Sequence, residues 1–271
     1  MNEKNRKLFE PTKIGSMRLQ NRFVMAPMTT NANPNHVIDD GMIDYYEEIA
    51  KGGVGMIVCD TQIVSNKIDP WYEAVTIIGT NEQKVRFMAL TERLKGYGTK
   101  LCVQLTIGPG RNAFPIPGKA SVSASAIPGL YDPSQNTRAL TLEEVESIPR
   151  AFADVALMAK EAGFDAAEVH AHTGYLLDQF ISKNWNKRTD KYGGSLENRL
   201  RLLTEILQAI KEKAGQAFPV FIRVSGQHHF PGGRTLDTFP EIIRKLDEAG
   251  YDGFDVDSGS YEAIEWIFPP S

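Results

Sequence analysis

Short apolar segments alternate along this chain with longer segments of helical character, and this alternation constrains the fold more than any other feature. The apolar segments share the length and continuity of buried parallel strands, and they cover residues 22–28, 53–60, 100–105, 165–170, 219–225 and 253–257. Between them the sequence predicts helices at about 40–51, 81–96, 141–162, 195–214 and 236–249. Such a strand–helix alternation predicts parallel βαβ units.

The size and charge of the chain narrow its class. With 271 residues and 42% hydrophobic content, the chain can bury one large core, so we expect a single α/β domain over residues 1–271, and a barrel is within this range. The formal net charge of −4 is mild and no basic block occurs. We therefore expect neither a nucleic-acid partner nor an anionic membrane surface.

The cysteines and the N-terminus point to an ordinary soluble protein. Cys59 and Cys102 both fall inside predicted strands, where a cysteine usually acts as a small apolar core residue. No CxxC motif indicates a metal site, and no disulfide framework is expected. The charged N-terminus lacks an apolar signal segment, and no run of about 18 apolar residues occurs. We expect a cytoplasmic protein without a bound metal.

The most informative stretch covers residues 165–201. Its apolar strand runs directly into His170, His172, Thr173, Gly174 and Tyr175. Polar, titratable groups that gather where a strand ends are typical of α/β barrels, whose chemistry lies at the C-terminal ends of the strands. The rest of the stretch predicts a glycine turn followed by a capped helix start.

This stretch closely resembles the flavin-binding barrel of the old yellow enzyme family, which includes the 2,4-dienoyl-CoA reductases and related NADH:flavin oxidoreductases. The family pattern is H-x-x-[HN]-G-Y-L, followed by N-x-R-x-D-x-Y-G-G-S-x-E-N-R. The matching residues are His170, Gly174, Tyr175, Leu176, Asn186, Arg188, Asp190, Tyr192, Gly193, Gly194, Ser195, Glu197, Asn198 and Arg199. The resemblance implies a (β/α)8 TIM barrel that uses FMN and NADH or NADPH to reduce C=C bonds conjugated to a carbonyl in a small enone or enoyl substrate.

The number of strand–helix steps departs from that family. Six steps can be counted instead of eight, so we expect an incomplete barrel with strands 1–6 and without strands 7 and 8. The loops after strands 7 and 8 form the phosphate site in such barrels. Two interpretations stay open: an FMN-dependent ene reductase, or a barrel fragment or subunit without independent flavin binding or catalysis. A homo-oligomer or a missing C-terminal region is expected to account for the absent strands. A flavin-free lyase or aldolase is disfavoured, because no strand end offers a Schiff-base lysine.

The resemblance assigns catalytic roles to the end of the fourth strand. It implies that His170 polarises the substrate carbonyl and that Tyr175 donates a proton to the α-carbon. The second donor of the family, a His or Asn three residues after His170, is Thr173 here. His172 lies on the same face as His170 if the strand continues, so either His172 or Thr173 is predicted to replace that donor. Each catalytic role has a structural alternative. His170 could be satisfied by hydrogen bonds to the backbone, Tyr175 could be a packing residue with a bonded hydroxyl, and His172 could be an exposed loop residue.

The resemblance also implies a set of flavin contacts. Gln104 pairs with the donor–acceptor edge of the flavin ring, and Arg223 lies near its N1 and O2 atoms. The remaining contacts follow the first strand and comprise Ala26, Pro27, Met28 and Thr29. Two alternatives need no flavin: Gln104 as a satisfied core amide, and Arg223 paired with Asp255 or Asp257, because a buried cation requires a partner.

Three local features complete the predictions. Residues 8–23 predict a hairpin that closes the bottom of the barrel, as in the family. Residues 106–140 lack periodicity and predict either a functional lid or a disordered segment. Thr141 and Glu144 form the pattern of a capping box at the start of the third helix.

Overall fold

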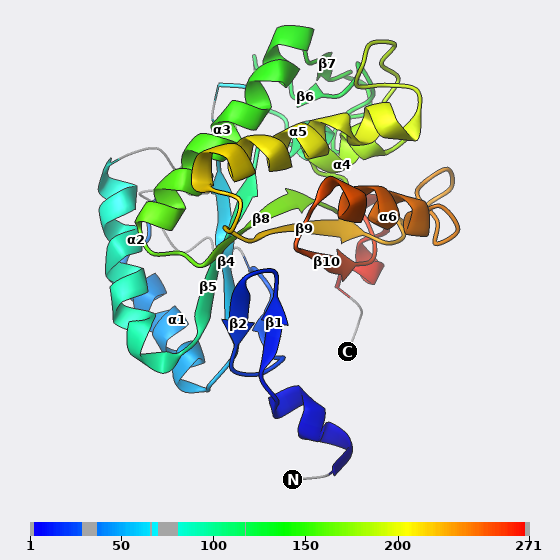
Figure 1. Cartoon of the computed structure of the whole chain (residues 1–271). Helices are drawn as coiled ribbons and strands as arrows, with labels where there is room; N and C mark the ends of the chain where they lie inside the picture. Colours follow the sequence, from blue (N-terminus) through cyan, green and yellow to red (C-terminus); the bar gives the residue numbers. More distant parts are fainter. Residues whose placement is uncertain (1–2, 29–36, 66, 70–80, 117, 269–271) are drawn as a thin grey trace.

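The computed structural model describes residues 3–28, 37–65, 67–69, 81–116 and 118–268 (Figure 1). Its centre is a sheet of six parallel strands in the order β10-β9-β8-β5-β4-β3. The strands are β3 (Val24–Met25), β4 (Met56–Ile63), β5 (Lys100–Thr106), β8 (Ala166–Ala171), β9 (Val220–Ser225) and β10 (Gly253–Asp257). Each lies within or overlaps a predicted strand. Within the described residues β3 and β10 do not pair with each other, so the sheet is an open half-barrel, which agrees with the prediction of an incomplete barrel.

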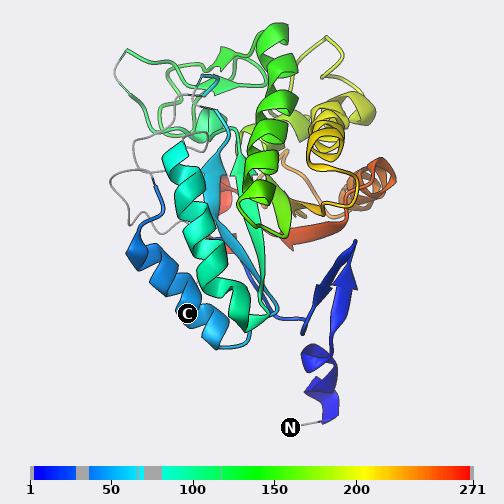
Figure 2. The ribbon, with the colours of Figure 1, turned by 60° about the vertical axis from the view of Figure 1, so that its left-hand side comes forward.

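The five predicted helices are present, and they lie on one side of the curved sheet together with a short helix that the sequence did not predict. Figures 1 and 2 show α1, α2, α3 and α5 on this outer side. The helices are α1 (Asp40–Lys51), α2 (Asn81–Leu94), α3 (Leu142–Glu161), α5 (Leu196–Ala214), α6 (Phe239–Ala249) and the unpredicted α4 (Leu176–Ile181). The 3-10 helices are η1 (Glu3–Phe9), η2 (Lys95–Tyr97), η3 (Gly110–Asn112) and η4 (Tyr261–Trp266).

Alternate residues of each strand serve two different environments, because successive side chains of a strand point to opposite faces. One set packs against the helices in the main core and is apolar throughout, as Val103, Val169 and Ile222 illustrate. The other set faces the inside of the half-barrel. Near the start of the strands it is also apolar, and Cys102 and Phe221 belong to it. Towards the ends of the strands it becomes polar and titratable.

The predicted hairpin closes the bottom of the half-barrel. Strands β1 (Thr12–Ile14) and β2 (Met17–Leu19) pair antiparallel around Gly15 and Ser16. Gly15 has φ +55°, a left-handed conformation that glycine adopts without the strain of a Cβ atom. Met17 and Leu19 pack into the inner apolar cluster with Phe221, so the hairpin gives that cluster its floor.

The segment that connects β5 to α3 is folded against the domain where the structure describes it. It contains η3, β6 (Val122–Ser123) and β7 (Arg138–Ala139). Ser123 is buried and donates a hydrogen bond to Gln179 of α4, with 2.7 Å between the oxygens. The capping box is confirmed, since the Thr141 hydroxyl accepts from Glu144 N and Glu144 bonds back to Thr141 N. None of the helices in the described ranges is long and apolar enough to cross a membrane.

Candidate functional site

A row of polar side chains lies inside the half-barrel at the C-terminal ends of its strands. Register pairs His170 of β8 with Arg223 of β9, and Arg223 with Asp255 of β10. One step lower, Gln104 of β5 is in register with Glu168 of β8. The parallel sheet therefore gathers residues from four strands into one site, at the position where parallel barrels carry their chemistry.

His170 is held as a neutral imidazole. Burial, followed by the nearby charges of His172 and Arg223, lowers the pKa of His170 well below its ordinary value. Its Nδ1 atom is buried and makes no hydrogen bond within the described part of the chain. The ring therefore keeps hydrogen-bonding capacity at Nδ1 for a ligand.

His172 follows β8 directly and lies beside His170. The two rings meet edge to face, with 4.2 Å between their centroids. The residue is 8% exposed, so the alternative of an exposed loop histidine is wrong. Its Nδ1 atom is hydrogen-bonded to the Oδ2 atom of Asp257, at the end of β10. This pair was not predicted, because the two residues are far apart in the chain.

Thr173 and Tyr175 have different surroundings. Thr173 is buried in a left-handed conformation, with φ +52°, and its Oγ1 atom makes no hydrogen bond within the described residues. Tyr175 precedes α4, and its hydroxyl lies 2.9 Å from the hydroxyl of Tyr261 in η4. Burial and the neighbouring Tyr261 raise the pKa of Tyr175 well above its ordinary value, so the phenol stays protonated. Tyr261 was not predicted.

Gln104 has protein partners at both ends of its amide. Its Nε2 atom donates to Glu168 Oε1 over 2.8 Å, and its Oε1 atom accepts from the Thr61 hydroxyl. This arrangement is the satisfied core amide considered as an alternative. Burial and the charge of Asp255 raise the pKa of Glu168 to about 8, so this carboxyl is protonated at neutral pH.

Arg223 also has the partners that the sequence offered as an alternative. Its Nε atom lies 3.4 Å from Asp255 Oδ2 and 3.3 Å from Asp257 Oδ2. These are charge contacts without hydrogen-bond geometry, because the buried Nε makes no hydrogen bond in the described structure. The guanidinium is therefore balanced by two carboxylates while one of its donors is unused.

The expected flavin contacts after β3 lie at the edge of the sheet, away from its centre. Ala26 is exposed, Pro27 is half-buried and Met28 is 56% exposed. Thr29 lies outside the described residues. These side chains form an open border next to β4, and β4 and β5 separate them from β8, which carries His170.

A buried ion cluster below Tyr175 was missed by the sequence analysis. Asp178 of α4 binds Arg234 Nη2 at 2.6 Å and His228 Nε2 at 3.0 Å, and it accepts a hydrogen bond from Gly174 N. Burial alone would raise the pKa of Asp178, but Arg234, His228 and these hydrogen bonds hold it well below its usual range. The sequence feature that could have indicated this cluster is the PGGR segment at 231–234. Because such segments are common in turns, it could not identify the cluster.

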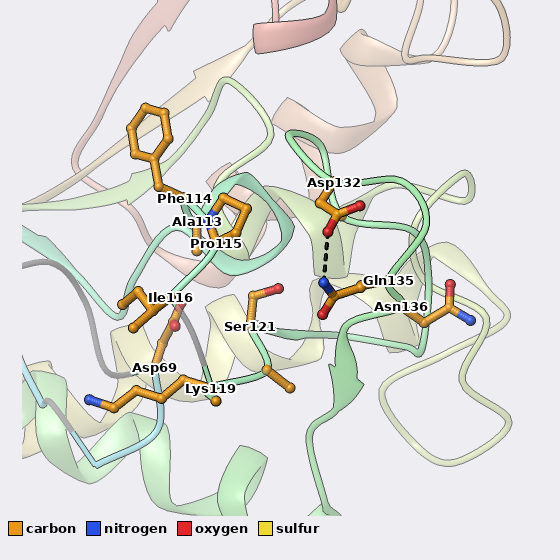
Figure 3. A pocket seen from close by; sticks show the side chains of 13 residues that line it. Asp69, Ala113, Phe114, Pro115, Ile116, Lys119, Ser121, Asp132, Gln135 and Asn136 are labelled. Carbon is orange, nitrogen blue, oxygen red and sulfur yellow. Dashed lines mark hydrogen bonds between the residues drawn. The ribbon is translucent and has the colours of Figure 1, made fainter.

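A cavity of about 350 Å³ opens in the segment between β5 and α3 (Figure 3). Figure 3 shows Asp69 and Lys119 at one end and the hydrogen-bonded Asp132 and Gln135 at the other. Burial raises the pKa of Asp69 to about 7.

An aromatic pair links this segment to the site. The ring of Phe114, which lines the cavity, stacks on Tyr131 with 4.4 Å between centroids. Burial, and then the charges of Tyr261 and Glu262, raise the pKa of Tyr131. Arg111 also forms an ion pair with Glu262. The aromatic pair therefore lies on the η4 side of the site, near Tyr175.

Comparisons with known proteins agree with this geometry. The sequence profile of the NADH:flavin oxidoreductase / NADH oxidase family matches residues 7–269. A cinnamate reductase of Clostridium sporogenes is 39% identical over 297 aligned residues, which cover 100% of this chain and 44% of the relative.

Two solved structures share the fold. A 2-naphthoyl-CoA reductase in complex with 2-naphthoyl-CoA has a TM-score of 0.85 at 29% identity, over 95% of this chain and 41% of that one. An old yellow enzyme from Pichia sp. AKU4542 has a TM-score of 0.80 at 30% identity, over 97% and 73%. The chain thus spans less than half the length of the cinnamate reductase and the naphthoyl-CoA reductase.

Proposed function

Because the chain belongs to the NADH:flavin oxidoreductase / NADH oxidase family, we propose that it binds FMN across the C-terminal ends of its strands and uses NADH or NADPH to reduce a C=C bond conjugated to a carbonyl. The family assignment confirms the predicted resemblance to old yellow enzymes and the fold class, and it supports the proposed enzyme class of flavin-dependent oxidoreductase. FMN and a nicotinamide reductant are the cofactors of this family.

One observation carries the proposal. His170 Nδ1 and Arg223 Nε are buried at the ends of two adjacent strands, in register, and neither makes a hydrogen bond within the described structure. Buried polar atoms without partners are rare and costly, so a bound group with acceptor atoms accounts for them. An isoalloxazine edge and a substrate carbonyl both provide such atoms.

When bound, the flavin supplies the hydride that reduces the alkene. His170 holds the substrate carbonyl by a hydrogen bond that strengthens as negative charge develops on the oxygen. His172 or Thr173 provides the second contact to that oxygen. Because its pKa is raised, Tyr175 keeps a proton on its hydroxyl, and it delivers that proton to the α-carbon of the substrate.

The proposed flavin contacts are Gln104, Arg223, the border formed by Ala26, Pro27 and Met28, and Thr29, which lies outside the described residues. Gln104 gives up its hydrogen bond with Thr61 and forms hydrogen bonds with the edge of the flavin ring instead. Arg223 brings a positive charge whose Nε donor is unused, which suits the electron-rich side of a reduced flavin.

The substrate class follows from the wall beside Tyr175. We infer a small acceptor with an aromatic ring conjugated to the alkene, because Phe114 and Tyr131 present a stacked, partly exposed pair on that side. The names of the cinnamate and naphthoyl-CoA reductases agree with this choice.

A visible absorption spectrum of the purified chain, with and without added FMN, tests the function. Flavin bands that co-purify, bleach with NADH without oxygen and return on addition of cinnamaldehyde support the proposal. A colourless chain that fails to bind added FMN overturns it in favour of a barrel fragment without independent catalysis. His170→Ala is the companion variant, and it should keep the flavin bands while the recovery by cinnamaldehyde slows.

A further inference from the structure

We propose that Asp257 is a positioning residue for His172, and that this pair takes the place of the second carbonyl donor that the family carries at the position of Thr173. The inference rests on the proposed ene-reductase function and selects between the two candidates that the sequence left open. The pair joins β8 to β10, the two strands on either side of β9.

A continuous set of hydrogen bonds fixes His172. The Thr173 backbone N–H donates to Ser225 Oγ over 2.8 Å, and Ser225 Oγ donates to Asp257 Oδ1 over 3.0 Å. The other carboxylate oxygen, Oδ2, is bonded to His172 Nδ1. The backbone at the end of β8 and the imidazole beside it are therefore both tied to one carboxylate, which leaves the ring a single orientation.

The orientation presents the other ring nitrogen to the site. His172 Nε2 makes no hydrogen bond to any described residue, and the ring packs edge to face on His170. The Tyr175 ring lies 6.2 Å away, between centroids. His172 thus borders the space between the predicted carbonyl donor and the predicted proton donor.

Thr173 is less exposed than His172. The residue is 2% exposed, its Oγ1 atom is buried, and its N–H is already bonded to Ser225. A left-handed φ of +52° holds it in the tight turn that leads to Tyr175. Its backbone N–H and C=O both have protein partners, and its Oγ1 atom is left unpaired in the described structure, so the Thr173→Ala variant tests it directly against His172.

The chemistry of the pair follows from the proton count. Asp257 accepts a hydrogen bond from the Nδ1–H group of His172. The other ring nitrogen, Nε2, can therefore donate to a substrate oxygen only when both ring nitrogens carry a proton. The charged groups near the ring are Asp257, which is bonded to it, and Arg223, which contacts Asp257, while the neighbouring His170 and Tyr175 are neutral. A charged donor gains most as the carbonyl oxygen becomes negative, and the proton stays on His172 throughout.

Asp257→Asn tests the proposal, and Asp255→Asn is the matched control. Both variants remove a carboxylate that lies 3.3 to 3.4 Å from Arg223 Nε, but Asp257 alone of the two is bonded to His172. The first readout is the ¹⁵N spectrum of the imidazoles in the full chain without flavin. We expect the His172 signals to change in Asp257→Asn and to stay as in the wild type in Asp255→Asn.

The second readout is kinetic, in the FMN-loaded chain. We expect Asp257→Asn to lower the rate of alkene reduction about 10- to 100-fold, the range known for groups that orient a functional histidine, while flavin reduction by NADH changes less than about 2-fold. Asp257→Glu should restore part of the rate. His172→Ala should lower the same rate and Thr173→Ala should not.

The opposite results overturn the proposal: unchanged His172 signals in Asp257→Asn, or a rate that depends on Thr173 and not on His172. The spectrum without flavin decides the positioning role even if the wild-type chain binds no FMN. A failure of the proposed function is therefore distinguishable from a failure of this inference.

Discussion

Replacing Glu168 by Gln should stabilise the protein without changing the shape of its interior. Glu168 is 2% exposed, and its Oε1 atom accepts a hydrogen bond from Gln104 Nε2. Burial and the charge of Asp255 raise its pKa from 4.5 to about 8. A glutamine has nearly the same volume and can accept the same hydrogen bond, and it never has to carry a buried charge.

The size of the effect follows from the two pKa values. Between pH 4.5 and pH 8 the folded state binds a proton at Glu168 that the unfolded state has released, so the free energy of unfolding falls as pH rises through this interval. At 1.36 kcal/mol per pKa unit, the loss is about 3 kcal/mol by pH 7 and levels off at about 5 kcal/mol above pH 8. Glu168→Gln removes this loss, so its advantage over the wild type should grow with pH.

Urea unfolding of both proteins without flavin at pH 5, 6, 7 and 8 measures the difference. Asp69, whose pKa is raised to about 7, adds a similar slope to both proteins and cancels in the comparison. Glu212→Gln, at an exposed position of α5, is the matched control and should give no pH-dependent difference. A Glu168→Gln advantage that stays constant from pH 5 to pH 8 would refute the reasoning, because it would mean that Glu168 is charged in the folded protein.

Three further predictions concern the site and its support. Tyr175→Phe should slow alkene reduction and spare flavin reduction by NADH, because only alkene reduction uses the phenol proton. A stopped-flow measurement in which both half-reactions are lost would contradict this role. Arg234→Met should cost about 3 to 5 kcal/mol in urea unfolding, because it leaves the buried Asp178 carboxylate with one charged partner fewer; a cost below about 1 kcal/mol contradicts it. Phe114→Ala should raise the KM for cinnamaldehyde more than for 2-hexenal, since only the former offers a ring to stack; equal changes in steady-state assays contradict the aromatic subsite.

The strands were predictable because their environment leaves a strong signal. In a parallel sheet covered by helices, both faces of a strand are buried at its start, so residues 56–59 at the start of β4 appear as a continuous apolar run. The capping box at Thr141 and the serine cap of α5 are local interactions, and local sequence is sufficient to identify them. The positions of His170 and Tyr175 at a strand end followed from the same pattern.

What could not be predicted depends on residues that meet only in the folded chain. Asp257 lies 85 residues after His172, and their contact requires the register of β8, β9 and β10. The partner of Tyr175, Tyr261, comes from a 3-10 helix whose position depends on the Arg111–Glu262 ion pair. Helix α4 has six residues, too few for a periodic pattern, although it carries the buried Asp178.

The inner face of the half-barrel shows how stability and chemistry are separated along the same strands. Its lower layer, with Cys102 and Phe221, is apolar and is closed by the hairpin. The layer above contains a carboxyl that must stay protonated, Glu168, and a cation with an unused buried donor, Arg223. Those features cost stability in the protein alone, whereas a ligand with acceptor atoms over the strand ends offsets part of that cost. The apolar layer stabilises the domain, and a bound cofactor can offset part of the energetic cost of the polar layer.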